Sequence, residues 1–79
     1  MFNVYAIKSE KDKRIYVGMC EYVETRLKQH NSGKSKSTKG FRPWKLIYEE
    51  EVADRSEARK REIYLKSGIG KEFLRSLVP

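Results

Sequence analysis

The sequence predicts an α+β fold: a three-stranded antiparallel sheet, made of a β-hairpin and a third strand, flanked by helices in the order β-β-α-β-α-α. Three observations support this. Two short apolar runs bracket a charged segment, a third alternating run lies near the middle of the chain, and helical periodicity follows the hairpin and the third run. A chain of 79 residues holds one domain at most, so residues 1–79 are assigned to a single unit.

The first two strands are predicted to form a hairpin. Residues 2–8 and 15–17 are mostly apolar and alternate in character, whereas residues 9–14 between them are all polar or charged. Side chains two residues apart point to the same face of a strand. If the strands pair, Tyr5 and Tyr16 can therefore lie side by side on one face.

Residues 21–30 are predicted to form a helix that ends at residues 31–33. Acidic residues come early in this segment, basic ones later, and Asn and Gly follow it. The stripe facing the sheet comprises Val23, Leu27 and His30. Arg26 lies one helical step to its side. A single histidine at the edge of a buried face is most often structural, and a lone arginine is most often solvated. Their i, i+4 pairing beside the tyrosine hairpin favours a functional role.

Residues 32–43 are predicted to be a loop, since Gly, Ser and Lys dominate them. The basic residues of this loop are Lys34, Lys36, Lys39 and Arg42. Hydroxyl groups lie between them in the sequence, and this combination of charges and small donors suits the binding of phosphate oxygens. The alternative is that the segment is a solvated flexible loop. Phe41 and Trp44 flank the exit of the loop. We expect Trp44 in the core and leave Phe41 open between packing and base stacking.

Residues 44–52 are predicted to form the third strand, with Trp44, Leu46 and Tyr48 on one face. The strand ends in three successive glutamates, residues 49–51. Adjacent strand residues point to opposite faces, so these carboxylates cannot converge on one ion. We interpret them as surface charge.

A second long helix is predicted to begin at Asp54 or Ser56 as N-cap and to stop at residues 67–68. Glu62 falls on the stripe that faces the sheet, where a carboxylate is costly unless a cation meets it. A metal ion, a salt bridge to a neighbouring Lys or Arg, or a rotated helix with Ile63 inward are the alternatives. A last helix over residues 70–78 is expected to pack through its apolar residues, Phe73, Leu74 and Leu77.

Composition narrows the partners. The net charge of +7 and pI near 9.7 indicate a polyanion, most often nucleic acid. A single Cys20 excludes an internal disulfide and, with only one histidine, a Cys/His zinc cluster. No apolar stretch reaches membrane-spanning length, and no signal-peptide pattern follows Met1. We therefore expect a cytoplasmic protein that does not engage a membrane.

Two tripeptides and three later residues resemble one known family. Asn3-Val4-Tyr5 and Tyr16-Val17-Gly18, followed by Arg26, His30 and Glu62, resemble the GIY-YIG nuclease family in order and spacing over almost the whole chain. The chain is most similar to its small stand-alone members, which resemble the N-terminal nuclease domain of the bacterial excision-repair nuclease subunit. The resemblance implies the same three-stranded sheet flanked by helices.

The resemblance also implies a function. It implies a metal-dependent endonuclease that hydrolyses phosphodiester bonds in DNA, with RNA left open, guided by structure rather than sequence and acting in DNA repair or recombination. Glu62 would hold Mg²⁺ or Mn²⁺, and Arg26 the scissile phosphate. One of Tyr5 and Tyr16 would be the general base, with Tyr16 slightly favoured, and His30 would orient a tyrosine or relay its proton.

Two departures from the family pattern motivate an alternative. Many members carry an asparagine about three turns beyond the metal-binding glutamate, where this chain has Leu74 and Ser76. Some carry a lysine after the second glycine, where this chain has Met19. The alternative is a nucleic-acid-binding module that does not cut, or a nuclease subunit that needs a protein partner for targeting. A basic structural protein would require the five matching positions to be coincidental.

Overall fold

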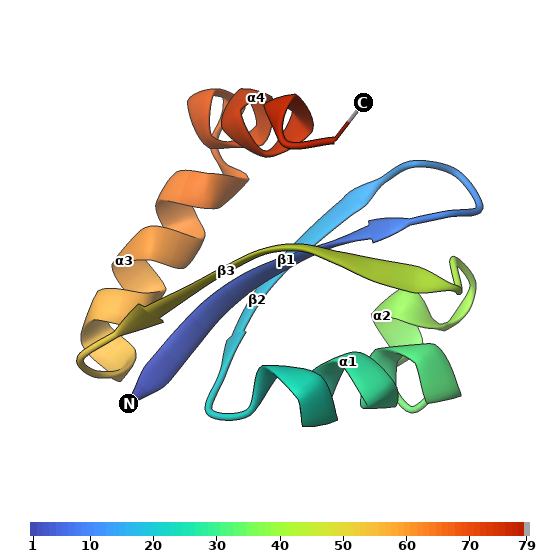
Figure 1. The fold of residues 1–79 in the computed structure, drawn as a ribbon, viewed down its shortest axis with the longest axis horizontal. Helices are drawn as coiled ribbons and strands as arrows, with labels where there is room; N and C mark the ends of the chain where they lie inside the picture. The colour runs from blue at the N-terminus through green and yellow to red at the C-terminus, as the bar shows by residue number, and fades with distance from the viewer. Residues whose placement is uncertain (79) are drawn as a thin grey trace.

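The computed structural model describes residues 1–78, which form a three-stranded antiparallel sheet with helices on both faces (Figure 1). The central strand β1 (Phe2–Ser9) pairs with β2 (Ile15–Cys20) on one side and with β3 (Trp44–Val52) on the other. Strand β2 is therefore an edge strand. The predicted fold class and hairpin are confirmed.

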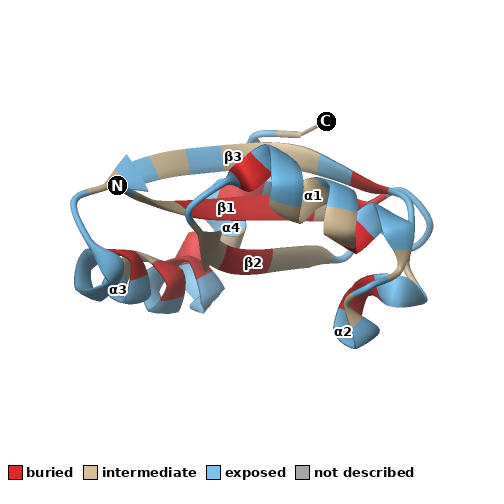
Figure 2. Cartoon of the chain, turned by 90° about the horizontal axis from the view of Figure 1, so that it is seen from below, coloured by how far each residue is buried: buried red, intermediate tan, exposed pale blue. Residues whose placement is uncertain are grey.

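Four helices accompany the sheet: α1 (Val23–Ser32), α2 (Lys36–Lys39), α3 (Arg55–Lys66) and α4 (Gly68–Ser76). Helix α1 lies on one face of the sheet, and α3 and α4 lie on the other (Figures 1 and 2). No helix within residues 1–78 has the length and apolar character needed to cross a membrane.

Three helix ends follow the predicted signals, but α1 begins at Val23, two residues later than predicted, without a side-chain N-cap. Gly33 takes a left-handed conformation, with φ 86°, directly after α1. Asp54 is the N-cap of α3, because its side chain accepts a hydrogen bond from the Glu57 amide at 2.9 Å. Ser67 ends α3 and caps α4 by accepting from the Gly70 amide at 3.3 Å. One serine thus forms the corner between two helices.

Each face of the sheet has its own core (Figure 2). On the face of α3 and α4, the buried residues are Val4, Ala6, Val17, Ala58, Leu65 and Leu74. On the face of α1, the buried apolar and aromatic residues are Tyr5, Ile7, Val23 and Trp44. Trp44 lies in the core as predicted, and partly buried Phe41 packs against it.

The prediction that Trp44, Leu46 and Tyr48 share one face is wrong. Ile7 pairs with Leu46 but Ala6 pairs with Tyr48, so the register shifts by one residue between them. Such a β-bulge reverses the side chains beyond it. Tyr48 therefore joins the face of α3 and α4, where its ring meets that of Phe73 edge-on at 5.5 Å between centroids.

Two further expectations need correction. The segment expected to be a loop contains the short helix α2, which sequence composition hides because its residues are polar. In α4, Leu74 is fully buried and Phe73 packs on Tyr48, although Phe73 and Leu77, the residue that follows α4, are 41% and 43% exposed. A helix packed on one line of contact buries only a narrow stripe, and these two residues lie at its margin.

Candidate functional site

The predicted tyrosine Tyr5 lies across Gly18 of the neighbouring strand. The two residues are directly paired in the β1–β2 ladder. A Cβ atom added to Gly18 would lie 2.6 Å from the Tyr5 hydroxyl oxygen. Only glycine therefore leaves room for the phenol on this strand, and Tyr5 is almost fully buried there, with 1% exposed.

Tyr5, His30 and Thr38 form a buried chain of hydrogen bonds. His30 Nε2 lies 2.8 Å from Tyr5 Oη, and His30 Nδ1 lies 2.8 Å from Thr38 Oγ1. The Thr38 hydroxyl donates to the Ser35 carbonyl at 3.4 Å, so its oxygen is free to accept from Nδ1–H. Nε2 then carries no proton and accepts from the Tyr5 hydroxyl. The network thus assigns the His30 tautomer.

Thr38 is a site residue that the sequence analysis missed. It is fully buried on α2, and its carbonyl accepts from the Trp44 indole Nε1 at 2.8 Å. Nothing in the sequence distinguishes it from the serines around it, because its role depends on α2 folding back against α1. His30, expected at the edge of the buried face, is fully buried through the same contact.

Tyr16 and Arg26 border this network at its exposed side. The Tyr16 ring meets the His30 ring at 5.1 Å between centroids and is partly buried. The Arg26 guanidinium interacts with the Tyr5 hydroxyl and also donates to Gln29 Oε1 at 3.0 Å. The structure therefore brings together four of the five predicted site residues: Tyr5, Tyr16, Arg26 and His30.

The surroundings of the cluster keep the side chains of Tyr5 and His30 uncharged. Burial raises the pKa of Tyr5 to about 12, and the hydrogen bond from Arg26 offsets only part of this rise. Burial, followed by the nearby Arg26 charge, lowers the pKa of His30 below its usual range. At neutral pH Tyr5 is thus a protonated donor and His30 an uncharged acceptor, consistent with the assigned tautomer.

Glu62 lies apart from this cluster. It is on α3, across the sheet, and only 7% exposed, so the predicted inward direction is confirmed, with Ile63 57% exposed. Its carboxylate accepts from Arg59 Nη1 at 2.6 Å and pairs with Lys66 Nζ at 3.5 Å. Within residues 1–78 no hydrogen bond or ion pair joins Glu62 to the tyrosines.

Strand β2 separates the two groups. Tyr5 covers Gly18 on one face of this edge strand. On the other face, Met19 lines a surface hollow together with Arg59, the ion-pair partner of Glu62. A ligand that touched both groups would have to reach around the free edge of β2.

The donor set fits one kind of metal. No group of three or more His, Cys, Asp or Glu side chains converges within the described part of the chain. A closed zinc-type centre is therefore not formed there. Mg²⁺ and Mn²⁺ can be bound by a single carboxylate when water and phosphate oxygens complete the coordination. Glu62 can supply that carboxylate. Its partners Arg59 and Lys66 have side chains 61% and 52% exposed, and both would have to move aside.

The predicted basic residues of segment 34–42 are all exposed: Lys34, Lys36, Lys39 and Arg42. Arg42 Nε donates to the Lys39 carbonyl at 2.8 Å, which fixes the guanidinium beside α2. Lys39, Arg42 and Lys11 line a surface hollow of about 420 Å³, here named the α2 hollow. The segment thus presents its cations on an ordered support.

The three glutamates of β3 do not converge, as predicted. Glu50 is partly buried and forms a two-pronged ion pair with Arg61, at 3.0 Å from Nε to Oε2 and 3.0 Å from Nη2 to Oε1. It also accepts from the Tyr48 hydroxyl. Glu49 and Glu51 are both exposed, and the β1 residues with which they pair face α1.

Comparison with known proteins agrees with this geometry. A sequence model of a family described as "GIY-YIG catalytic domain" matches residues 1–72. The UPF0213 protein SH2523 of Staphylococcus haemolyticus is 43% identical over 65 residues, 81% of this chain and 78% of that protein. The UPF0213 protein CPE1444 of Clostridium perfringens is 42% identical over 64 residues, 80% and 68% of the two chains.

A solved structure shares the fold. The solution NMR structure of the UPF0213 protein BH0048 from Bacillus halodurans has a TM-score of 0.57 and 34% sequence identity. The match covers 98% of this chain and 85% of that one. The names of these relatives state no activity.

Proposed function

This chain belongs to the GIY-YIG catalytic domain family, and on that premise we propose that it is a metal-dependent endonuclease that hydrolyses phosphodiester bonds in DNA. The observation that carries the proposal is the hydrogen bond between Tyr5 and His30, with the Tyr16 ring packed on His30 and the Arg26 charge beside Tyr5. These residues come from β1, β2 and α1. Their convergence over Gly18 supports a built site rather than a chance motif.

The charges of the cluster suggest a division of roles. Arg26 presents forked donors and a fixed charge, which suit the non-bridging oxygens of a phosphate that gains charge in the transition state. Burial raises the pKa of Tyr5, and its hydroxyl group is hydrogen-bonded to His30. Tyr5 therefore serves to orient His30 rather than to accept a proton. Tyr16, less buried, is left as the residue to orient or deprotonate the attacking water.

The remaining group is the metal. When bound at Glu62, Mg²⁺ or Mn²⁺ would supply charge stabilisation at the phosphate. In the hydrolysis, the water gives a proton to the general base and its oxygen forms a bond to phosphorus. The bond from phosphorus to one sugar oxygen breaks, and that oxygen takes up a proton. The chain's own residues bind the phosphate through Arg26 and position the water through Tyr16.

The substrate and setting are part of the same proposal. DNA shape rather than base sequence would guide cutting, with RNA as a second substrate to be tested. Exposed cations at Lys34, Lys36, Lys39 and Arg42 would hold the backbone. A free Cys20 fits a reducing compartment, which supports a cytoplasmic role in DNA repair or recombination.

The test compares two glutamates of α3. Purified wild type, Glu62→Gln and Glu57→Gln are incubated with plasmid and branched DNA in Mg²⁺, in Mn²⁺ and in chelator. Glu57 is exposed and pairs with Lys60, so it is a matched control. We expect Glu62→Gln to lose at least ~100-fold in cleavage, because a metal supplies several kcal/mol of transition-state stabilisation. Cutting that persists in Glu62→Gln or in chelator would contradict the proposal.

One observation favours a second candidate, the non-cleaving nucleic-acid-binding module. Both carboxylate oxygens of Glu62 are engaged by cations, and the carboxylate lies across β2 from the tyrosines. Binding of DNA that weakens with salt, without cleavage in any divalent metal, would support this candidate. Recovery of cleavage on adding a protein partner would instead support a nuclease subunit.

A further inference from the structure

The end of the molecule that carries the β1–β2 turn is strongly basic. Lys13, Arg14, Lys71 and Arg75 line a narrow groove of about 160 Å³ between this turn and α4, with Ile15 as its one apolar residue. We name it the turn groove. No acidic residue lines it. Arg14 is ion-paired with Asp12 at 2.7 Å, so the like charges to be balanced at this groove are those of Lys13, Lys71 and Arg75. A bound polyanion would relieve their repulsion.

The turn that presents Lys13 and Arg14 is well ordered. The Ser9 amide donates to the Arg14 carbonyl at 2.8 Å, and the Lys13 amide donates to the Ser9 carbonyl at 3.0 Å. Lys13 itself has φ 70°, a left-handed conformation that costs a residue other than glycine about 1–2 kcal/mol. These hydrogen bonds hold the backbone of the turn, and thus the positions from which Lys13 and Arg14 extend.

The β1–β2 turn lines both hollows, the α2 hollow through Lys11 and the turn groove through Lys13 and Arg14. Lys11 Nζ donates to the Gly40 carbonyl at 3.4 Å, which ties the turn to the end of α2. The Arg14 guanidinium lies 3.5 Å from the centre of the Phe41 ring. Phe41 in turn is fixed because its carbonyl accepts from Ser9 Oγ at 2.6 Å. The two basic hollows thus flank one rigid turn.

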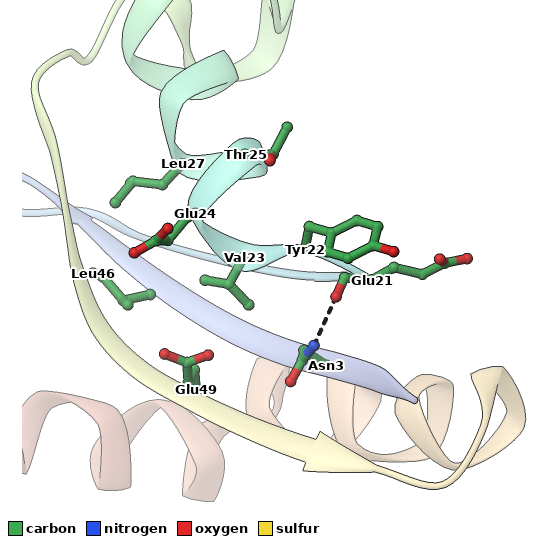
Figure 3. A pocket seen from close by; sticks show the side chains of 9 residues that line it. All are labelled: Asn3, Glu21, Tyr22, Val23, Glu24, Thr25, Leu27, Leu46 and Glu49. Carbon is green, nitrogen blue, oxygen red and sulfur yellow. Dashed lines mark hydrogen bonds between the residues drawn. The ribbon is translucent and has the colours of Figure 1, made fainter.

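The opposite end of the sheet is mixed in charge, and one hollow there is basic, since Arg55, Arg59 and Lys60 line it beside Met19. The end of β3 and the start of α1 carry Glu49, Glu21 and Glu24, which line a hollow of about 460 Å³ (Figure 3). The β1–β2 turn and the start of α1, which carries part of this hollow, lie at opposite ends of β2 (Figure 1). The acidic hollow repels a polyanion, whereas, among residues 1–78, the linings of the turn groove and the α2 hollow contain no carboxylate.

We propose that the turn groove is a second phosphate-binding subsite, which together with the α2 hollow holds a nucleic-acid backbone across the β1–β2 turn. The proposal rests on the nucleic-acid part of the proposed function, not on cleavage. Tyr16 follows Arg14 by two residues on β2, or about 7 Å of strand. A backbone bound at the turn is therefore delivered to the start of the edge strand that carries the candidate base.

The test measures binding in chelator, so that cleavage has no influence. Fluorescence anisotropy of a labelled branched duplex is followed over a range of salt concentrations. The turn-groove variant is Lys71→Gln/Arg75→Gln, and Lys39→Gln/Arg42→Gln probes the α2 hollow. The matched control, Lys28→Gln/Lys60→Gln, removes the same charge from exposed residues outside both hollows. Urea unfolding of every variant checks that the fold is kept.

We expect the slope of log K against log salt to fall in magnitude by about 1.8 for each hollow variant, since each phosphate contact contributes about 0.9. The control should keep the wild-type slope. An unchanged slope in Lys71→Gln/Arg75→Gln, or an equal loss in the control, would overturn the subsite. Binding to phosphatidylserine vesicles with none to duplex would also overturn it. Binding with these slopes but no cleavage in Mg²⁺ would leave the subsite standing and reject the endonuclease.

Discussion

The two faces of the sheet differ in what they bury. The face toward α3 and α4 is closed by aliphatic side chains such as Val4, Leu65 and Leu74, all fully buried. The face toward α1 encloses a polar chain from Tyr5 through His30 to Thr38 in place of part of its aliphatic core. Burial of apolar surface stabilises the first face, whereas the second depends on complete hydrogen bonding.

This difference separates the face that stabilises the fold from the face that carries the candidate site. Within residues 1–78 no buried side-chain nitrogen or oxygen lacks a partner, so the polar face is tolerated because every group on it is satisfied. A domain of this size has limited stability, and it places its candidate chemistry on one face only. The apolar face should carry most of the folding energy.

The largest effect is expected from a cavity-forming substitution in the core of the apolar face. Leu65→Ala should lower the free energy of unfolding by about 2–5 kcal/mol, because it leaves a cavity in the closed core. Urea denaturation with an unchanged slope would measure this loss. The control Ile63→Ala, on the same helix but 57% exposed, should cost less than about 0.5 kcal/mol. Equal costs for the two variants would show that the α3 contact contributes little.

A smaller effect is expected from crowding the polar face. Gly18→Ala places a methyl group 2.6 Å from the Tyr5 hydroxyl oxygen and should push the phenol away from His30. Overpacking of this kind costs about 1–3 kcal/mol. The control Gly68→Ala has no atom within 4 Å of the added carbon and should be neutral or stabilising. Calorimetric melting of both variants, with cleavage assayed in parallel, would separate them.

If Gly18→Ala melts like the wild type and keeps its activity, the close packing of Tyr5 over β2 is not required. Loss of activity with little loss of stability would instead place the importance of this contact in the geometry of the site.

The smallest effect is a pH dependence of stability confined to the polar face. His30 has a folded-state pKa below its unfolded value near 6.5, so the unfolded chain binds the proton first. Stability is therefore full above about pH 6.5 and falls as pH drops below it, by up to about 1.4 kcal/mol per pH unit. His30 is the single histidine of the chain. Urea unfolding at pH 7.0 and 5.5 should show this loss in the wild type and a flatter response in His30→Gln. Parallel responses would assign the dependence to other groups.

The sequence determined the local features of the fold. Strand and helix periods, the caps at Asp54 and Gly33, and the inward position of Glu62 are set by residues near one another in the chain. The resemblance to the GIY-YIG family in order and spacing also indicated the two tyrosines and Arg26.

Only the tertiary structure decided the rest. The bulge at Ile47 arises from the pairing of two distant strands, and the role of Thr38 arises from α2 folding against α1. The same holds for Glu62, which faces the sheet as predicted but on the side opposite Tyr5. The hydrophobic periodicity of a helix shows that a side chain faces inward. Which face of the sheet that side chain meets depends on the face against which the helix packs. Long-range packing makes that choice, and no local pattern records it.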